Sequence, residues 1–348
     1  MKKIAYIEID THAEIAQDFI DLMHDSKEFS VDYYFSEKIK NQIRGNEESV
    51  HLSDSSMILD QLSGKKYDLI IIGTVHRYFN TFLAITQKYN TSIIVHNLNF
   101  SQISKFHLLQ NIFKNDLMYR LKLWWKEGLF FTKKTYGKAK NHLVLDKELS
   151  SENRKFLPIF YTKSFEKTEN NALTIVIPGG VSEKRRDYQH VFLTIQKIKN
   201  KENFNFIFLG KATGKELKEV EKLSENLPEN VQVTYFSERV SSEVFDEWMK
   251  KADVLWCPIQ EKTEFFSQKE VYGKTKMTGN LGDAIKYGKI AVFPKNYLSK
   301  LDFIVSEKEN VIEQFMNLKK LTFDFQKDFS REKIQKDLES TLNQLIAI

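Results

Sequence analysis

Residues suited to binding a phosphate group gather in the sequence from Glu270 to Pro294, EVYGKTKMTGNLGDAIKYGKIAVFP. The segment 273–279 predicts a polar loop that carries Lys276 and Thr278, and Asn280–Tyr287 predicts a short helix directly after it. The first backbone N–H groups of a helix have no partner within the helix and lie at its positive end, so an anion is favoured there. This arrangement favours a phosphate or diphosphate ligand. An ordinary loop–helix turn with solvated lysines is the alternative interpretation.

A second group of glycines and cations follows the predicted strand Leu173–Ile177. The sequence PGGVSEKRRDY places two glycines, which allow close approach of the backbone to a ligand, shortly before Lys184, Arg185 and Arg186. An arginine side chain can donate two parallel hydrogen bonds to a diphosphate. A solvated basic turn is the alternative for each cation. Most strands of this half end in a glycine or polar residue with a cation nearby, which favours the phosphate-binding interpretation.

In the first half, titratable side chains follow directly after predicted strands. Asp10 and His12 follow the strand Ile4–Ile9, His76 follows YDLIIIG, and His96 follows SIIV. An imidazole group is suited to act as a general base because its ordinary pKa lies near neutrality. We expect His96, His12 and Asp10, in this order, to be the candidates for deprotonating a substrate hydroxyl group. A hydrogen-bonded structural role is the alternative for each histidine.

Short apolar runs alternate with segments of helical period through most of the chain, as in βαβ units. Tyr67–Gly73 (YDLIIIG) is continuously apolar after its first two residues, which is typical of a parallel strand buried on both faces. We therefore predict an α/β fold with two Rossmann-like, doubly wound domains in tandem, which face each other across a cleft. The predicted domains are residues 1–165 and 166–329, joined by the polar linker 163–171. The predicted helix in 330–348 crosses back onto the first domain.

Composition excludes several classes of protein. The chain of 348 residues is 41% hydrophobic and 28% charged, which is typical of a globular protein too long for a single core. The single cysteine, Cys257, excludes an internal disulfide and indicates a reducing, cytoplasmic compartment. The N-terminal sequence predicts a strand and not a signal peptide, and no apolar run is long enough to span a bilayer. A net charge of +5 is too small to indicate nucleic-acid binding.

Residues 102–134 depart from the alternation of strands and helices. Phe106–Lys134 has helical character and interleaves aromatic residues, such as Trp124 and Trp125, with lysines and Arg120. A helix pair of this composition can lie on the anionic inner surface of a membrane, with aromatic side chains among the headgroups and cations on the phosphates. A helical hairpin that packs on the core and exposes a basic face is the alternative.

Four segments, in their order and spacing, carry a resemblance to a known family. PGGVSEKRRDY, FIFLGK, YFSERVSSEVFDEWMKKADVLWCP and YGKTKMTGNLGDAIKYGKIAVFP together resemble the carboxyl-terminal half of GT-B glycosyltransferases, above all the sugar-nucleotide-dependent enzymes of bacterial surface-polysaccharide assembly. The resemblance covers most of Leu173–Tyr297, and IEIDTHAEI and IIVHNLNF in the first half add weaker support. It implies a site for a nucleotide-diphosphate sugar, linked to UDP or GDP. We assign to this site Gly179, Gly180, Lys184, Arg185, Arg186, Phe236, Arg239, Glu270, Lys276, Thr278, Gly279, Asn280 and Asp283.

The resemblance also implies roles: the two glycine-containing turns would bind the diphosphate and donor sugar, Phe236 the base and Asp283 the ribose. Many retaining members carry two glutamates eight positions apart, whereas this chain has Thr275 and Asp283 there, with Glu270 the nearest acidic residue. No Asp-x-Asp motif indicates a metal, and no cofactor is expected.

The function we expect is sugar transfer to a glycan or lipid-linked acceptor in cell-surface polysaccharide assembly, in the cytoplasm or peripherally on the inner membrane. A nucleotide-sugar epimerase and a non-catalytic sugar-nucleotide- or glycan-binding homologue are the alternatives. The stereochemistry of transfer stays open.

Overall fold

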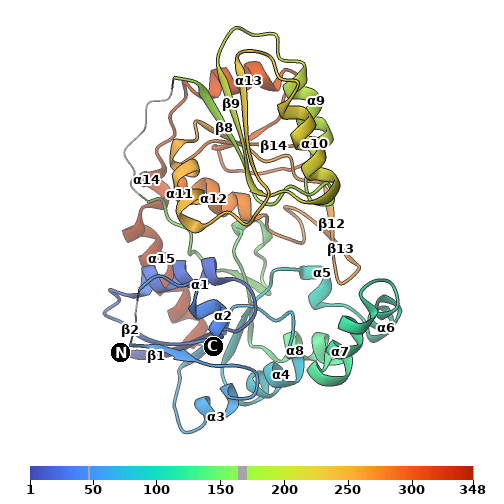
Figure 1. Cartoon of the computed structure of the whole chain (residues 1–348). Coiled ribbons are helices and arrows are strands. Elements are labelled where there is room, and N and C mark those ends of the chain that lie inside the picture. Colours follow the sequence, from blue (N-terminus) through green and yellow to red (C-terminus); the bar gives the residue numbers. More distant parts are fainter. Residues whose placement is uncertain (46–47, 164–170, 348) are drawn as a thin grey trace.

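The computed structural model describes residues 1–45, 48–163 and 171–347, so most of the predicted linker and the predicted boundary at 165 lie outside the described residues. The chain forms two parallel sheets with helices packed against them, one above the other in Figure 1. The predicted α/β class with two Rossmann-like units is therefore confirmed. We call the first sheet with its helices and the C-terminal helix the first domain, and the second sheet with its helices the second domain.

The first sheet has seven parallel strands in the order β3-β2-β1-β4-β5-β6-β7. The strand order reverses between β1 and β4, and in such sheets ligands bind beyond the carboxyl ends of the strands at that point. The bounds are β1 Lys2–Glu8, β2 Phe29–Phe35, β3 Val50–Leu52, β4 Leu69–Ile72, β5 Thr91–Ile94, β6 Asn141–Val144 and β7 Arg154–Phe156.

The second sheet repeats this topology with six parallel strands in the order β10-β9-β8-β11-β14-β15, and it reverses between β8 and β11. Each domain therefore has its own ligand-binding edge. The bounds are β8 Leu173–Pro178, β9 Phe204–Lys211, β10 Val231–Phe236, β11 Val254–Trp256, β14 Ala291–Phe293 and β15 Ile304–Ser306.

Helices connect successive parallel strands and pack on the sheets. In the first domain they are α1 Ala13–Met23, α2 Glu37–Lys40, α3 Ile58–Leu62, α4 Phe79–Lys88, α5 Leu98–Ser101, α6 Lys105–Ile112, α7 Leu117–Glu127 and α8 Thr132–Lys138, with 3-10 turns at Leu129–Phe131 and Lys147–Leu149. Those that follow are α9 Tyr188–Gln196, α10 Gly214–Ser224, α11 Ser242–Lys251, α12 Gly279–Tyr287, α13 Val311–Leu318, α14 Phe325–Phe329 and α15 Arg331–Ala347.

Strand β4 illustrates why the chain adopts parallel sheets. Leu69 and Ile71 are fully buried in the core on one face, whereas Ile70 and Ile72 are fully buried in the core on the other. A strand covered on both faces needs apolar residues at every position, and the sequence YDLIIIG supplies them.

Helix α15 crosses back onto the first domain, as predicted. Its buried residues Ile334, Leu338, Leu342 and Leu345 lie about one turn apart and join the same core cluster as Ile4 of β1. The helix lies beside α1, at the left of the lower domain in Figure 1. The first domain is therefore built from both ends of the described chain.

The segment after β11 forms an antiparallel hairpin of β12 Lys262–Phe265 and β13 Gln268–Val271. Its turn residues Phe266 and Ser267 have φ values of 53° and 57°. A two-residue hairpin turn requires such left-handed backbone, which residues other than glycine rarely adopt. The turn is therefore strained and needs support from its surroundings.

That support comes from helices α6 and α7 of the first domain. Asn111 Nδ2 donates to the carbonyl of Phe266 at 3.1 Å, and Arg120 Nη1 donates to Ser267 Oγ at 2.9 Å. The guanidinium group of Arg120 also lies over the ring of Phe266. Arg120 is therefore buried against the hairpin and is not one of the cations of an exposed face.

Candidate functional site

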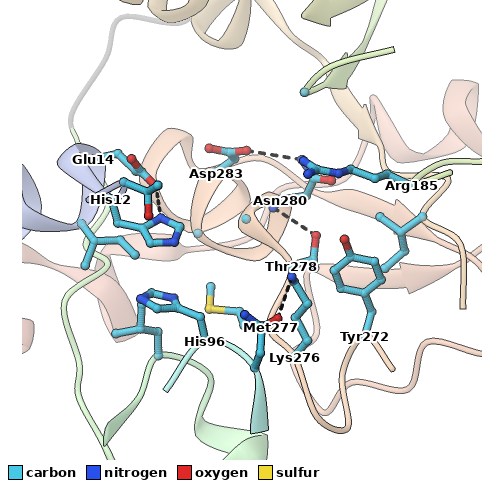
Figure 2. Close-up of a pocket in the computed structure, with 18 of the residues that line it drawn as sticks. His12, Glu14, His96, Arg185, Tyr272, Lys276, Met277, Thr278, Asn280 and Asp283 are labelled. Atoms are coloured by element: carbon cyan, nitrogen blue, oxygen red, sulfur yellow. Dashed lines mark hydrogen bonds and ion pairs between the residues drawn. The ribbon is translucent and has the colours of Figure 1, made fainter. Parts of the chain in front are cut away.

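A cleft lies between the two domains, at the carboxyl ends of both sheets, with a cavity volume of about 610 Å³. In Figure 2, His12 and His96 of the first domain lie on one side of the cleft and Lys276 and Asp283 of the second on the other. The cavity brings together ten of the residues that the sequence placed in the site. They are His12, His96, Gly179, Arg185, Arg186, Lys276, Thr278, Gly279, Asn280 and Asp283.

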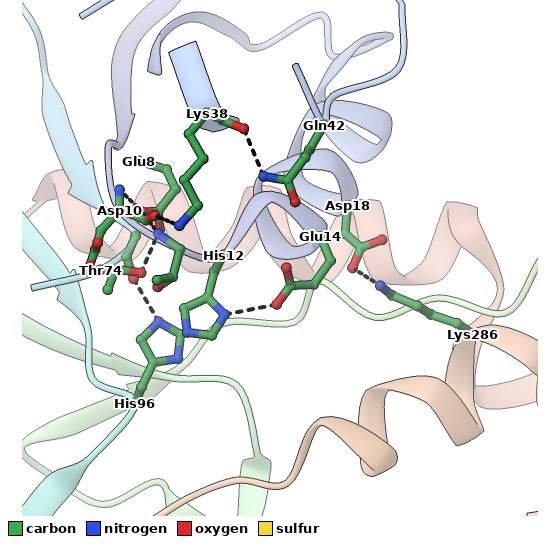
Figure 3. Close-up of polar contacts among 12 residues, drawn as sticks. Glu8, Asp10, His12, Glu14, Asp18, Lys38, Gln42, Thr74, His96 and Lys286 are labelled. Carbon is green, nitrogen blue, oxygen red and sulfur yellow. Dashed lines mark hydrogen bonds and ion pairs between the residues drawn. The ribbon is translucent and has the colours of Figure 1, made fainter. Parts of the chain in front are cut away.

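His12 and Glu14 form a histidine–carboxylate pair at the start of α1, drawn in Figure 3. His12 Nδ1 lies 2.8 Å from Glu14 Oε1, so Nδ1 donates to the carboxylate and Nε2 is left as the proton acceptor. Burial opposes protonation of this imidazole, but the hydrogen bond and charge of Glu14 outweigh it and raise the pKa of His12. The pair has the chemistry of an oriented general base.

Thr11 and Glu14 have the sequence spacing of a capping box, but they do not form one. Helix α1 begins at Ala13, and its N-cap residue is His12, whose side chain makes no capping hydrogen bond. The carboxylate of Glu14 is bonded to the imidazole instead.

A buried carboxylate fixes the loop that carries His12. Glu8, at the end of β1, is fully buried and accepts hydrogen bonds from the backbone N–H groups of Asp10 (2.9 Å) and Thr11 (3.2 Å). It also accepts from the hydroxyl group of Thr74 at 2.6 Å. A side chain at Gly73 would place its Cβ 2.6 Å from Glu8, so only glycine fits there. The buried carboxylate of Glu8 therefore fixes the geometry of the loop that carries His12.

His96 stacks on His12 with ring centroids 4.1 Å apart. Its Nε2 lies 2.8 Å from the carbonyl oxygen of Gly73 and must donate, because a carbonyl only accepts. Burial, with the positive charge of His12 second, lowers the pKa of His96 well below its usual range. These observations favour His12 over His96 as the base. Asp10 lies outside the cavity lining, and burial raises the pKa of its carboxyl group.

The opposite wall is the N-terminal end of α12. Thr278 is its N-cap residue, and the hydroxyl group accepts from the Asn280 backbone N–H at 3.3 Å. A Cβ added at Gly279 would meet nothing within 4 Å, so the first turn is open toward the cleft. Burial, then the charge of Arg185, lowers the pKa of Lys276 to about 8. Two cations thus converge on a helix N-terminus, which favours an anionic ligand.

Arg186 lies against the turn after β8. Its Nη2 donates to Asn280 Oδ1 at 3.2 Å, and Asn280 Nδ2 donates to the carbonyl of Pro178 at 3.1 Å. Gly179 has φ +103°, and a Cβ there would lie 2.2 Å from the guanidinium group. Glycine at position 179 therefore leaves the space that the guanidinium group of Arg186 occupies beside α12.

Asp283 and Lys286 extend the wall along α12. Burial raises the pKa of Asp283 to about 6, although the nearby Lys286 charge opposes the shift. Lys286 Nζ lies 2.6 Å from Asp18 Oδ2 of the first domain, with side chains only 15% and 3% exposed. Figure 3 shows this ion pair beside the His12–Glu14 pair. It joins the two domains at the edge of the cleft.

Two further features bear on ligands and location. In the parts of the chain that the structure describes, His, Cys, Asp and Glu side chains do not gather in groups of three or more that could hold a metal ion. Among the described helices, none combines the length and apolar character that crossing a membrane requires.

No family model and no curated protein matches the sequence. Solved structures match over the whole length. Sucrose-phosphate synthase from Thermosynechococcus elongatus superposes with a TM-score of 0.58 at 12% identity, covering 100% of both chains. Anabaena HepE, solved in complex with UDP-glucose, gives 0.59 at 11% identity over 99% of this chain and 100% of its own. UDP-GlcNAc 2-epimerase from Neisseria meningitidis, bound to UDP-GlcNAc, gives 0.53 at 13% identity over 98% and 100%. This chain has the GT-B fold.

Some residues that the sequence assigned to the donor site lie outside the lining of the GT-B cleft. Glu270 is fully buried and accepts from the backbone N–H groups of Phe100 (2.9 Å) and Asn99 (3.3 Å), so its carboxylate joins the two domains. Arg239 donates to Gln42 of the first domain at 3.0 Å. Three others also lie outside the lining: the exposed Lys184 and Gly180 and the partly buried Phe236.

The GT-B cleft also contains residues that were not assigned to the site, namely Glu14, His76, Asn97, Tyr272 and Lys286. His76 and Asn97 both follow predicted strands, and their position after a strand was the one sequence feature that could have indicated a place in the cleft. Glu14 was hidden because its spacing from Thr11 resembles a helix cap. Lys286 has no local signal, since its partner belongs to the other domain.

Proposed function

We propose that the protein is a glycosyltransferase that moves a sugar from a nucleotide-diphosphate sugar to a hydroxyl group of a glycan or lipid-linked acceptor. The proposal depends on one observation: a histidine–carboxylate pair faces the cationic N-terminal end of a helix across one cleft. His12 with Glu14 supplies a proton acceptor, while Lys276 and Arg185 supply positive charge for a leaving diphosphate. Both functions are needed at the same place for sugar transfer.

The donor lies along the second-domain wall in this proposal. Its diphosphate binds at the N-terminal end of α12, near the Gly279 N–H, where Lys276 and Arg185 neutralise its charge. Arg186 supports the same anion, and Asp283 accepts from a ribose hydroxyl group. The HepE and epimerase structures hold UDP-glucose and UDP-GlcNAc, which makes UDP-sugars the first donors to test, before GDP-sugars.

The acceptor lies on the first-domain wall beside His12. Its hydroxyl oxygen attacks the anomeric carbon, Nε2 of His12 takes the hydroxyl proton, and the bond from that carbon to the diphosphate oxygen breaks. The electrons of the broken bond leave with the nucleoside diphosphate, and the carboxylate of Glu14 stabilises the imidazolium that forms. Attack opposite to the leaving group inverts the anomeric centre, which agrees with the absence of a glutamate pair at Thr275 and Asp283.

A thermal-shift screen of UDP, GDP, CMP, ADP and dTDP identifies the donor class. A ligand at about 100 times its Kd adds about 2.7 kcal/mol to the free energy of unfolding, which is readily measured. The selected sugar nucleotide is then incubated with candidate acceptors, with and without EDTA, and product formation is followed. Binding of one diphosphate, with transfer that depends on His12 and not on added metal, supports the proposal. No binding by any of them refutes it.

An epimerase is the second candidate because the Neisseria meningitidis enzyme shares this fold over nearly the whole chain. An epimerase would convert the sugar nucleotide without an acceptor, so nuclear magnetic resonance of the donor after incubation with the protein alone distinguishes the two. Selective binding without consumption of the donor, under every acceptor condition, would instead favour a non-catalytic binding protein.

We also propose that α6 and α7 rest on an anionic membrane surface, where a lipid-linked acceptor of polysaccharide assembly would be found. Phe106, Phe113, Met118 and Trp125 are 65%, 66%, 80% and 75% exposed, an unusual set for a solvated face. The same segment of the chain carries six exposed lysines: Lys105, Lys114, Lys122, Lys126, Lys133 and Lys134. Aromatic side chains and cations together match the headgroup region of anionic lipids.

Sedimentation with lipid vesicles tests this location. The protein should bind vesicles that contain phosphatidylglycerol and lose binding to pure phosphatidylcholine vesicles and at high salt. Replacing Phe113 and Trp125 by serine should abolish binding, whereas Leu193→Ser, at a residue 53% exposed on the second domain, should not. Equal binding by both variants would refute the proposed surface.

A further inference from the structure

A chain of hydrogen bonds crosses the cleft beside the proposed phosphate site. Lys276 Nζ donates to Asn97 Oδ1 at 2.8 Å, and Asn97 Nδ2 lies 3.0 Å from His76 Nε2. Lys276 belongs to the second domain, whereas Asn97 and His76 follow β5 and β4 of the first. Asn97 is only 2% exposed, so its amide group depends on these partners.

The donors and acceptors in this chain can be assigned in only one way. An ammonium group only donates, so Asn97 presents its carbonyl oxygen to Lys276 and its NH₂ group to His76. The NH₂ group only donates, so His76 accepts at Nε2 and carries its proton on Nδ1. Burial, followed by the charges of His12 and Lys276, lowers the pKa of His76 to about 3, which keeps this ring neutral.

The backbone around Asn97 is joined to the second domain as well. The next residue, Leu98, donates its N–H to the carbonyl of Thr275 at 2.9 Å, directly before Lys276 in the sequence. Phe265 of hairpin β12–β13 packs on His76 with ring centroids 4.3 Å apart. The loops that carry Asn97 and Lys276 are therefore fixed to each other by backbone and side-chain contacts.

We propose that Asn97, oriented by His76, is a positioning residue that holds the ammonium group of Lys276 where the donor diphosphate binds. The proposal rests on the glycosyltransferase function proposed above. A free lysine side chain loses rotamer entropy when it is fixed, and the hydrogen bond to Asn97 fixes Lys276 before the ligand arrives. An amide oxygen uses one of the three ammonium N–H groups and leaves both the charge and two donors for phosphate.

The proposal also makes the first domain part of the diphosphate site. When the domains separate, Lys276 loses its partner on the other side of the cleft. Diphosphate affinity and closure of the cleft are then linked, because both favour the same position of Lys276.

Titration calorimetry with UDP and uridine, or GDP and guanosine if guanine is selected, tests the proposal. Asn97→Ala should weaken diphosphate binding about tenfold and nucleoside binding less than threefold. Asn97→Asp should weaken diphosphate binding more, because a carboxylate beside Lys276 neutralises its charge and repels phosphate. In a Lys276→Met background, Asn97→Ala should have no further effect.

Asn99→Ala is the matched control, since Asn99 lies two residues further along, in α5, and its side chain donates across the domains to the carbonyl of Lys269 at 3.0 Å. It should leave diphosphate binding within twofold of the native value, and the melting temperature of this variant shows whether the protein stays folded. Unchanged diphosphate affinity in Asn97→Ala overturns the proposal. Equal losses for diphosphate and nucleoside, or the same loss in Asn99→Ala, also overturn it.

Histidine-selective ¹⁵N resonance spectra of the ligand-free protein separate this inference from the proposed function. His76 should be a neutral Nδ1–H tautomer in the native protein, and this fixed tautomer should be lost in Asn97→Ala. An Nε2–H tautomer in the native protein overturns the inference even if UDP binds. If no nucleoside diphosphate binds, the proposed function fails, but a fixed Nδ1–H tautomer that depends on Asn97 still supports the hydrogen-bonded chain.

Discussion

Replacing Glu14 by glutamine should slow sugar transfer about fivefold and move the pH dependence of the reaction to lower pH. The carboxylate oxygen lies 2.8 Å from His12 Nδ1, and the Glu14 side chain is 60% exposed. A charge-assisted hydrogen bond contributes about 1.5–3 kcal/mol, and an exposed ion pair about 0.2–1 kcal/mol. Because solvent screens more than half of this carboxylate, we take about 1 kcal/mol, which is about fivefold in rate.

The direction of the pH effect follows from the role of His12 as a base. His12 accepts a proton only when it is neutral, so kcat/KM rises as the pH increases through the pKa of His12. The carboxylate of Glu14 raises that pKa. In Glu14→Gln the rise should therefore occur at lower pH. His12→Gln, which removes the base altogether, should lower kcat by about 10²–10⁴.

The assay is release of nucleoside diphosphate in the presence of acceptor, measured across a pH series for both variants. A second pair at the far end of α1 provides the control: His24 Nδ1 lies 2.8 Å from Asp25 Oδ1, away from the cleft lining. His24→Gln should leave kcat and the pH profile unchanged. A Glu14→Gln profile that coincides with the native one, or a His12→Gln rate within threefold of it, would refute the assignment of this pair.

Further substitutions test how the cleft is built. Asp18→Asn should lower the free energy of unfolding by about 3–5 kcal/mol in denaturant titrations, because the nearly buried Lys286 loses its countercharge. Glu270→Gln should cost about 1–3 kcal/mol in the same titrations but leave nucleotide affinity unchanged, since its carboxylate bonds backbone groups of the first domain. A matching fall in affinity would place Glu270 in the donor site. Gly179→Ala should weaken nucleoside diphosphate binding at least about tenfold in calorimetry, because Cβ would displace the guanidinium group of Arg186; native affinity would show that this turn does not contact the diphosphate.

Elements with a strong local signal could be predicted from the sequence. The apolar run of YDLIIIG predicts β4, and the four-residue spacing of Ile334, Leu338 and Leu342 predicts α15. The hairpin β12–β13 could not be predicted, because Phe266 and Ser267 form a turn without the usual glycine or asparagine. The turn is supported by contacts with α6 and α7, which are distant in the sequence. The local sequence around the turn therefore does not reveal these contacts.

The residues of the candidate site also divide into those that the local sequence predicts and those that depend on contacts between the domains. Lys276 and Thr278 were placed at a helix N-terminus because loop and helix are adjacent in sequence. Whether Glu270 faces a ligand or the other domain depends on how the two domains pack together. The neighbouring residues in the sequence do not determine that packing. The same holds for Asn97, which the sequence could only place after a strand.

The return of α15 to the first domain also has a mechanical consequence. The chain passes between the domains twice, near Thr162 and again near Phe329, and the two passages are bonded to each other: the Thr162 N–H donates to the Phe329 carbonyl at 2.8 Å. Two connections that are bonded to each other restrain the relative motion of the domains more than a single connection would. We expect such a pair of connections to allow the cleft to open and to resist twisting and sliding of the domains, so that His12 would face α12 in the same way at each closure. A single proteolytic cut in either passage would leave the two domains attached.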